Sequence, residues 1–181
     1  MKKLIPVFIL TSLFSTVTIA QNQYQVLVER QNEKSLKGII SRDALQNDTS
    51  FHWFAENIKG YNPNSDAVTG LKKNADSVQL VVFMGTWCED SHSIIPKFFA
   101  LTDAAGFSKD RITLIGVDRE KKTLSHLSEA LNITNVPTII VYQNGIEAGR
   151  IIEYGKSGMF DKDLAQILNM LPKKLTLPPT R

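Results

Sequence analysis

The segment VQLVVFMGTWCEDS, residues 78–91, decides the fold, because an apolar run ends there just before the single cysteine of the chain. Residues 78–84 have the length of a strand and contain one polar side chain. A run this apolar is typical of a central strand that is buried on both faces of a sheet with parallel pairing. The sequence therefore places Cys88 just beyond a buried strand, where a helix begins.

Apolar periodicity predicts the elements that follow Cys88. We expect a helix to about Ala105, a strand at 112–117, a helix at 121–131, a strand at 138–142, a hairpin turn at Asn144-Gly145, a strand at about 148–154 and a helix at 161–171. This order predicts an α/β fold in which helices flank a central mixed β-sheet.

Residues 21–77 are more polar, and they are predicted to form a helical N-terminal extension that packs on the core. Capping residues and apolar spacing indicate helices at 42–46, 51–59 and 64–74. The second of these helices carries a cluster of three aromatic residues, Phe51, Trp53 and Phe54. Such a cluster fits packing against the core, and it also fits a docking surface for a partner.

Residues 1–20 have the pattern of a secretory signal peptide. Lys2 and Lys3 precede an apolar run at 4–14, which is too short to span a membrane, and small residues end the segment at Ala20. We expect export to the periplasm, cleavage after Ala20 and no stable membrane insertion afterwards. Residues 172–181 are predicted to form a C-terminal tail.

Composition limits the remaining classes of function. With 181 residues, 43% of them apolar, the chain is long enough for one domain with a sizeable core. Without Lys2 and Lys3 the chain has 19 basic and 18 acidic residues, so no nucleic-acid partner is expected. One cysteine excludes an intramolecular disulfide.

The position of Cys88 suggests a nucleophile, since N–H groups at a helix N-terminus stabilise a thiolate. A second signal is Val136-Pro137-Thr138, where a proline directly precedes a buried strand. A cis peptide bond there would leave the backbone N–H and C=O groups of Val136 facing the cysteine.

The chain resembles the thioredoxin superfamily over residues 78–171. Five features carry the resemblance: Trp87-Cys88-Glu89-Asp90-Ser91 for the Trp-Cys-x-x-Cys signature, Pro96 for the helix-bending proline, Val136-Pro137-Thr138 for the cis-proline segment, Asn144-Gly145 for the hairpin and Gly155 for the glycine ending the last strand.

The resemblance implies a thiol–disulfide site that needs no cofactor. Cys88 would attack, Trp87 would cover it, and Val136, Pro137 and Gly155 would hold an extended substrate. The implied partners are protein or small-molecule thiols and disulfides.

Two residues depart from the family pattern. Ser91 stands where the family carries its resolving cysteine, a catalytic residue. An external thiol would therefore have to release a mixed disulfide formed by Cys88. Val82 stands six residues before Cys88, where many thioredoxins carry a buried acid. Both departures argue against an efficient dithiol reductase.

Charged neighbours are candidate modulators of the Cys88 thiol. Glu89 and Asp90 oppose a thiolate by like charge but complement the helix N-terminus, whereas a charged His92, one turn on, would favour it. Cys88 and His92 could also bind a soft metal, but two ligands are too few for a closed site, and no metal is predicted.

The leading hypothesis is an exported monothiol protein of thiol–disulfide exchange, with an oxidoreductase or isomerase-like activity. The alternative is a redox-inactive module that binds extended peptides beside Val136 and Pro137. In that case the helices of 21–77 would form an additional docking surface.

Overall fold

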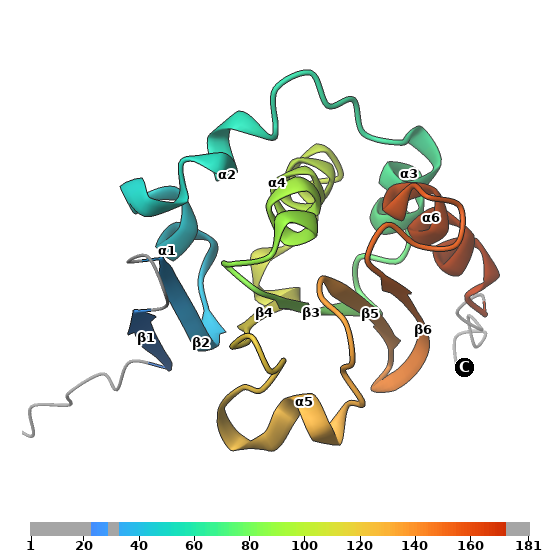
Figure 1. The fold of residues 1–181 in the computed structure, drawn as a ribbon. Helices are drawn as coiled ribbons and strands as arrows, with labels where there is room; N and C mark the ends of the chain where they lie inside the picture. Colours follow the sequence, from blue (N-terminus) through green and yellow to red (C-terminus); the bar gives the residue numbers. More distant parts are fainter. Residues whose placement is uncertain (1–22, 29–32, 173–181) are drawn as a thin grey trace, which may run out of the picture.

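A computed structural model describes residues 23–28 and 33–172, and it contains one six-stranded mixed sheet (Figure 1). The predicted signal peptide and most of the predicted tail lie outside the described residues. The strands follow the order β1-β2-β4-β3-β5-β6 across the sheet. Their bounds are β1 Tyr24–Val28, β2 Lys34–Ile40, β3 Val78–Met84, β4 Ile112–Gly116, β5 Thr138–Gln143 and β6 Ile146–Ile152.

Strand β3 lies inside the sheet, as its apolar run predicts. It pairs in parallel with β4 and antiparallel with β5. Val82 and Phe83, two consecutive residues of β3, point to opposite faces of the sheet, and both are completely buried. The sheet is therefore covered on both sides at the strand that leads into Cys88.

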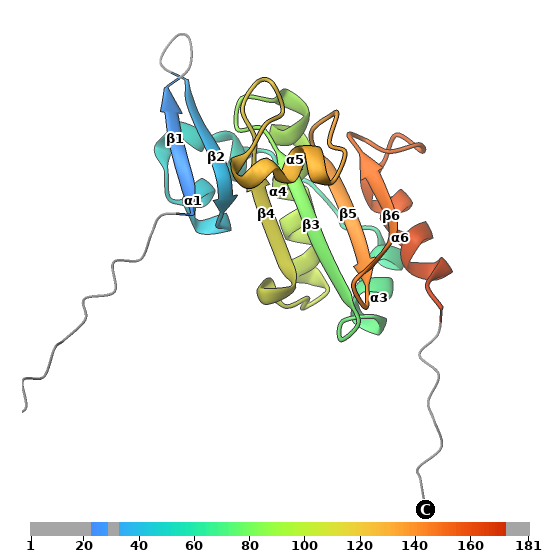
Figure 2. The same ribbon diagram turned by 90° about the horizontal axis from the view of Figure 1, so that it is seen from below.

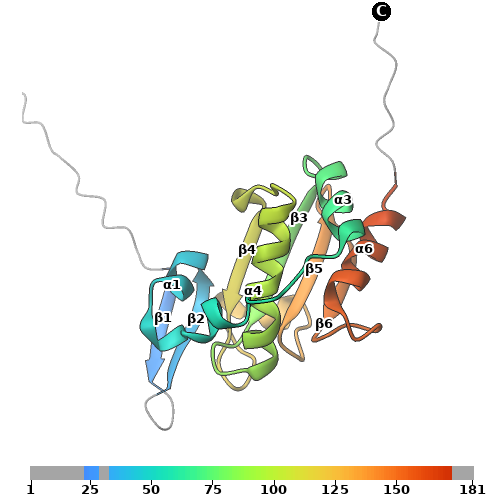
Figure 3. The ribbon, with the colours of Figure 1, turned by 90° about the horizontal axis from the view of Figure 1, so that it is seen from above.

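Most helices cover one face of the sheet (Figure 1). They are α1 Arg42–Gln46, α2 Trp53–Glu56, α3 Ser65–Lys73, α4 Glu89–Ala104 and α6 Phe160–Met170. Figure 3 shows α4 over the middle of the sheet, with α3 and α6 beside it. On the other face, α5 Leu127–Ala130 crosses the strands (Figure 2). The central mixed sheet with flanking helices is thus confirmed.

The N-terminal segment differs from the helical prediction, because its first part is a β-hairpin. Strands β1 and β2 pair antiparallel, and β2 joins the sheet antiparallel to β4. Gly38 and Gly116 face each other across that junction, and a Cβ at Gly116 would overlap the carbonyl of Leu36. The extended conformation gains its stability from this distant partner strand, which local periodicity does not reveal.

The predicted helices of the segment are present with modified ends. Ser41 caps α1 through its side-chain oxygen, which accepts the N–H of Ala44 at 3.2 Å, and Asn64 caps α3. The middle helix is shorter than predicted: a 3-10 turn, Thr49–Phe51, precedes α2, which ends at Glu56.

The helix predicted at 121–131 is also shorter in the structure. Lys121, Ser125 and His126 have positive φ angles, and only a 3-10 turn, Leu124–His126, and α5 remain. The Thr123 hydroxyl donates to the carbonyl of Gly116 at 2.8 Å, which ties this segment to the end of β4. The predicted hairpin and last helix are present as β5–β6 and α6.

Within the residues that the structure describes, every helix is too short or too polar to span a membrane.

Candidate functional site

Cys88 joins β3 to α4 and is the N-cap residue of α4. Its N–H donates to the carbonyl of Gly85 at 3.0 Å, and its carbonyl accepts the N–H of His92 at 2.9 Å. The thiol is free and partly buried, and Sγ lies 3.3 Å from the carbonyl oxygen of Val136, to which it donates. The structure thus brings together two predicted site residues that are far apart in the sequence.

Val136 and Pro137 form the opposite side of the site. Both are buried, and the peptide bond between them is cis. The carbonyl of Pro137 accepts the N–H of Glu153 at 2.7 Å, so the chain that leaves β6 lies alongside. Predicted site residue Gly155 follows in the β6–α6 loop, with positive φ, and packs against Asp163. The structure places it next to α6, without a described contact to Cys88.

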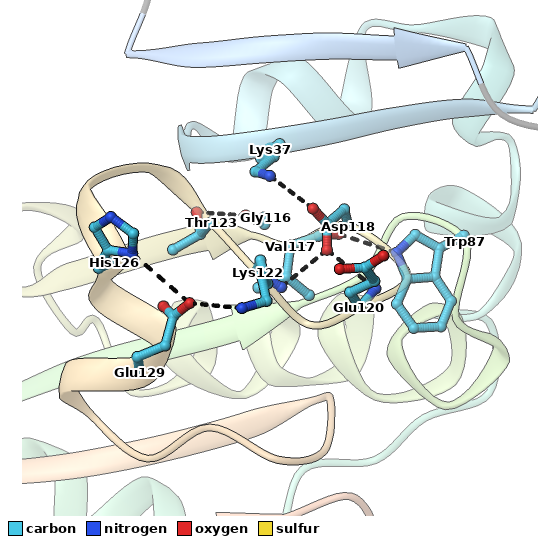
Figure 4. A network of polar contacts seen from close by, with 10 residues as sticks. All are labelled: Lys37, Trp87, Gly116, Val117, Asp118, Glu120, Lys122, Thr123, His126 and Glu129. Carbon is cyan, nitrogen blue, oxygen red and sulfur yellow. Dashed lines mark hydrogen bonds and ion pairs between the residues drawn. The ribbon is translucent and has the colours of Figure 1, made fainter.

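Trp87 is held from several directions. Its indole N–H donates to the carbonyl of Val117 at 2.9 Å (Figure 4). A Cβ at Gly85 would lie 2.6 Å from the indole ring, so glycine permits this close approach. The Arg119 guanidinium lies 5.4 Å from the ring centroid, at cation–π distance, and also pairs with Glu33. The ring beside Cys88 is therefore fixed by residues that follow β4.

Ser91 is completely buried one turn into α4. Its hydroxyl oxygen accepts the N–H of Gly85 at 3.2 Å. This side chain therefore stabilises the loop between β3 and Cys88.

The charged residues of the motif differ in their surroundings. The Glu89 side chain is 95% exposed, and Asp90 is half-buried beside it in the first turn of α4. His92 is largely buried: its Nε2 lies 2.7 Å from the carbonyl of Thr86, and its Nδ1 lies 3.8 Å from a Glu89 carboxylate oxygen. In the described part of the chain, no group of three or more side chains is arranged to bind a metal ion.

Three features near the site were missed by the sequence analysis. Trp53 stacks on His92, with centroids 4.3 Å apart and an interplanar angle of 17°. The hydroxyl of Thr86 accepts the N–H of Leu36 from β2 at 3.1 Å. Lys37 pairs with Asp118 at 2.6 Å. The aromatic cluster was a signal for the first feature, but the sequence did not indicate its contact.

The Lys37–Asp118 pair fixes the segment that supports Trp87 (Figure 4). Both side chains are about four-fifths buried, and Asp118 also accepts the N–H groups of Glu120 and Lys122. Burial alone would raise the pKa of Asp118, but the hydrogen bonds and charge of Lys37 and the N–H of Lys122 bring that pKa below its ordinary value. Asp118 is thus stabilised as a carboxylate.

The fold and site together define an α/β protein with a thiol at a helix N-terminus, facing a loop that contains a cis-proline. A sequence model of the thioredoxin family, described as "Thioredoxin", matches residues 66–166. The chain belongs to the thioredoxin family, and this membership indicates a thiol–disulfide redox function.

Individual thioredoxins show the same relationship. The thioredoxin of Echinococcus granulosus is 26% identical over 96 residues, which cover 53% of this chain and 83% of that protein. The thioredoxin of Mycoplasma genitalium is 30% identical over 89 residues, covering 49% and 78%. Among solved structures, thioredoxin f2 of Chlamydomonas reinhardtii is similar, with a TM-score of 0.42 and 22% identity over 57% of this chain and 88% of that one.

Proposed function

We propose that this protein performs thiol–disulfide exchange by a monothiol mechanism. The Cys88 thiol loses its proton to solvent, and the thiolate attacks one sulfur of a substrate disulfide. The substrate S–S bond breaks, one substrate thiolate leaves, and a mixed disulfide forms at Cys88. The thiolate of an external thiol then attacks the substrate sulfur of the mixed disulfide. Cys88 leaves as a thiolate, and the external thiol and the substrate are released as a new disulfide.

The contact between the Cys88 thiol and the Val136 carbonyl, at 3.3 Å, carries this proposal. It places the sulfur beside backbone that can pair with an extended substrate strand. In this proposal Trp87 covers the mixed disulfide, while Val136, Pro137 and Gly155 contact the substrate. The partners are protein or small-molecule thiols and disulfides.

The monothiol step rests on the single cysteine and on Ser91. The sequence contains no second cysteine thiol that could attack the mixed disulfide. The position three residues after Cys88 holds a buried hydroxyl instead, already bonded to Gly85. Release must therefore depend on a thiol supplied from outside.

We also propose that the protein works after export, in the periplasm, because residues 1–20 have the signal-peptide pattern. Disulfides persist in such oxidising compartments. The mass of the protein isolated from its native host tests this proposal: a chain starting at Gln21 supports it, and a chain that retains residues 1–20 contradicts it.

Steady-state exchange kinetics test the mechanism. We expect the protein-dependent rate of reduction of a peptide disulfide to rise in proportion to the concentration of an added monothiol such as glutathione, and the total rate to fall to the uncatalysed rate in Cys88→Ser. Ser93→Ala, on the same helix, is the matched control and should retain the wild-type rate. A rate independent of Cys88 would support the redox-inactive binding module instead.

A further inference from the structure

The N-terminal segment contacts the site through an aromatic stack. Trp53 of α2 and His92 of α4 lie nearly parallel, 4.3 Å apart, and Trp53 is 7% exposed. Phe51 also packs against Trp53, with ring centroids 5.9 Å apart and an interplanar angle of 58°. The His92 ring therefore lies against a buried, supported surface that restricts its orientation.

This orientation directs His92 at the loop before the cysteine. Its Nε2 is 2.7 Å from the Thr86 carbonyl oxygen, and because a carbonyl only accepts, Nε2 carries the hydrogen. The other ring nitrogen faces Glu89. The stack on Trp53 thus holds the Nε2–H of His92 against the carbonyl oxygen of Thr86, two residues before Cys88.

The same residue, Thr86, is held from β2 by its side chain. Its hydroxyl accepts the N–H of Leu36 at 3.1 Å and donates to the carbonyl of Lys34 at 3.3 Å. Thr86 is 4% exposed, so these bonds lie away from competing water. Strand β2 therefore holds the side chain of Thr86, while His92 of α4, stacked on Trp53 of α2, holds its carbonyl.

We propose that Trp53 is a positioning residue for Cys88, acting through His92 and Thr86. Thr86 precedes Trp87, and the turn is closed by the bond from the Cys88 N–H to the Gly85 carbonyl. By fixing Thr86, the N-terminal segment sets the direction in which Cys88 presents its sulfur. This inference rests on the proposed function, and it gives residues 34–53 a part in the reaction instead of partner docking.

Two substitutions of Trp53 separate the aromatic contact from general packing. Trp53→Leu retains an apolar side chain but removes the ring that faces His92, whereas Trp53→Phe retains a ring. Phe107→Leu is the matched control, because it removes a buried aromatic ring of the same core that has no described ring contact with Trp53 or His92.

Amide hydrogen exchange of the full-length folded protein is the first measurement. In Trp53→Leu we expect the amides of Cys88 and Leu36 to exchange about tenfold faster, while amides of β5 keep their wild-type rates. In Trp53→Phe and Phe107→Leu the two site amides should stay within about threefold of wild type. Equal protection of the two amides in Trp53→Leu and wild type would overturn the proposal, and so would an equal loss of protection in Phe107→Leu.

The rate of mixed-disulfide formation with 5,5′-dithiobis(2-nitrobenzoate) is the second measurement. Trp53→Leu should react about fivefold more slowly than wild type, and Trp53→Phe should recover most of the rate. An unchanged rate in Trp53→Leu would contradict a positioning role. A wild-type Cys88 that does not react would overturn the proposed function, whereas the exchange rates would still decide the contact between Trp53, His92 and Thr86.

Discussion

The hydroxyl of Ser91 accepts a hydrogen bond from the N–H of Gly85 at 3.2 Å, so Ser91 supports the loop that leads from β3 to Cys88. Both residues are buried, and the bond lies inside the turn between β3 and α4. A buried N–H without an acceptor costs about 1–3 kcal/mol. Ser91 is therefore expected to contribute to stability in addition to its part in the proposed monothiol mechanism.

Ser91→Ala should lower the free energy of unfolding by about 1–3 kcal/mol, because it leaves the Gly85 N–H without this acceptor. Urea denaturation measures the difference. Ser93→Ala, on a less buried side of the same helix, should change stability by less than about 0.5 kcal/mol. Equal stability of Ser91→Ala and wild type would show that the hydrogen bond is dispensable.

Ser91→Cys should increase the rate of disulfide reduction with a dithiol reductant by about tenfold or more, because intramolecular attack replaces a bimolecular release step. The rate of disulfide reduction by Ser91→Cys should remain below the rate of a dithiol thioredoxin, since Val82 supplies no buried acid and Glu89 and Asp90 oppose a thiolate. An insulin-reduction assay measures the rate. No gain in a folded variant would mean that release is not the limiting step.

Acid stability should depend on Asp118. The pKa of this carboxyl is lower in the folded protein than in the unfolded chain, so the stability it contributes is present above the unfolded pKa of about 4. That contribution is lost as the pH falls from about 4 through the folded value. Asp118→Asn should therefore flatten the loss of stability in this range, measured by urea denaturation at several pH values. The exposed Asp76 provides the control, and Asp76→Asn should follow the wild-type curve.

Gly116→Ala should destabilise the protein by about 1–3 kcal/mol, because the added methyl group would overlap the Leu36 backbone and separate β2 from β4. Gly149→Ala is a milder control, since the atoms nearest to its methyl group would belong to the flexible Ile167 side chain, at 3.1 Å. Thermal denaturation compares the two variants. Equal stability of Gly116→Ala and Gly149→Ala would show that the close approach of β2 to β4 does not matter for stability.

Local sequence patterns were sufficient to predict β3, α4 and the position of Cys88 between them, because burial and capping act over neighbouring residues. The Val136 segment was identified from its proline and from the family resemblance. Strands β1 and β2 were missed because their stability depends on pairing with β4, which follows much later in the chain. The Lys37–Asp118 pair spans 81 residues and has no local signal.

The stack of Trp53 on His92 was missed for a similar reason. The aromatic cluster was visible in the sequence, and packing on the core was one of its two expected roles. Its contact with the cysteine loop depends on how α2 lies against α4, which no spacing within either helix specifies.

Intact-mass spectrometry after incubation with oxidised glutathione tests the central claim most directly. The wild-type protein should gain one glutathione by a mixed disulfide at Cys88, keep it in the absence of free thiol and lose it when a monothiol is added. Cys88→Ser should gain nothing, and Ser91→Cys should release the adduct without added thiol by forming an internal disulfide. A folded wild-type protein that gains no adduct would contradict the monothiol mechanism.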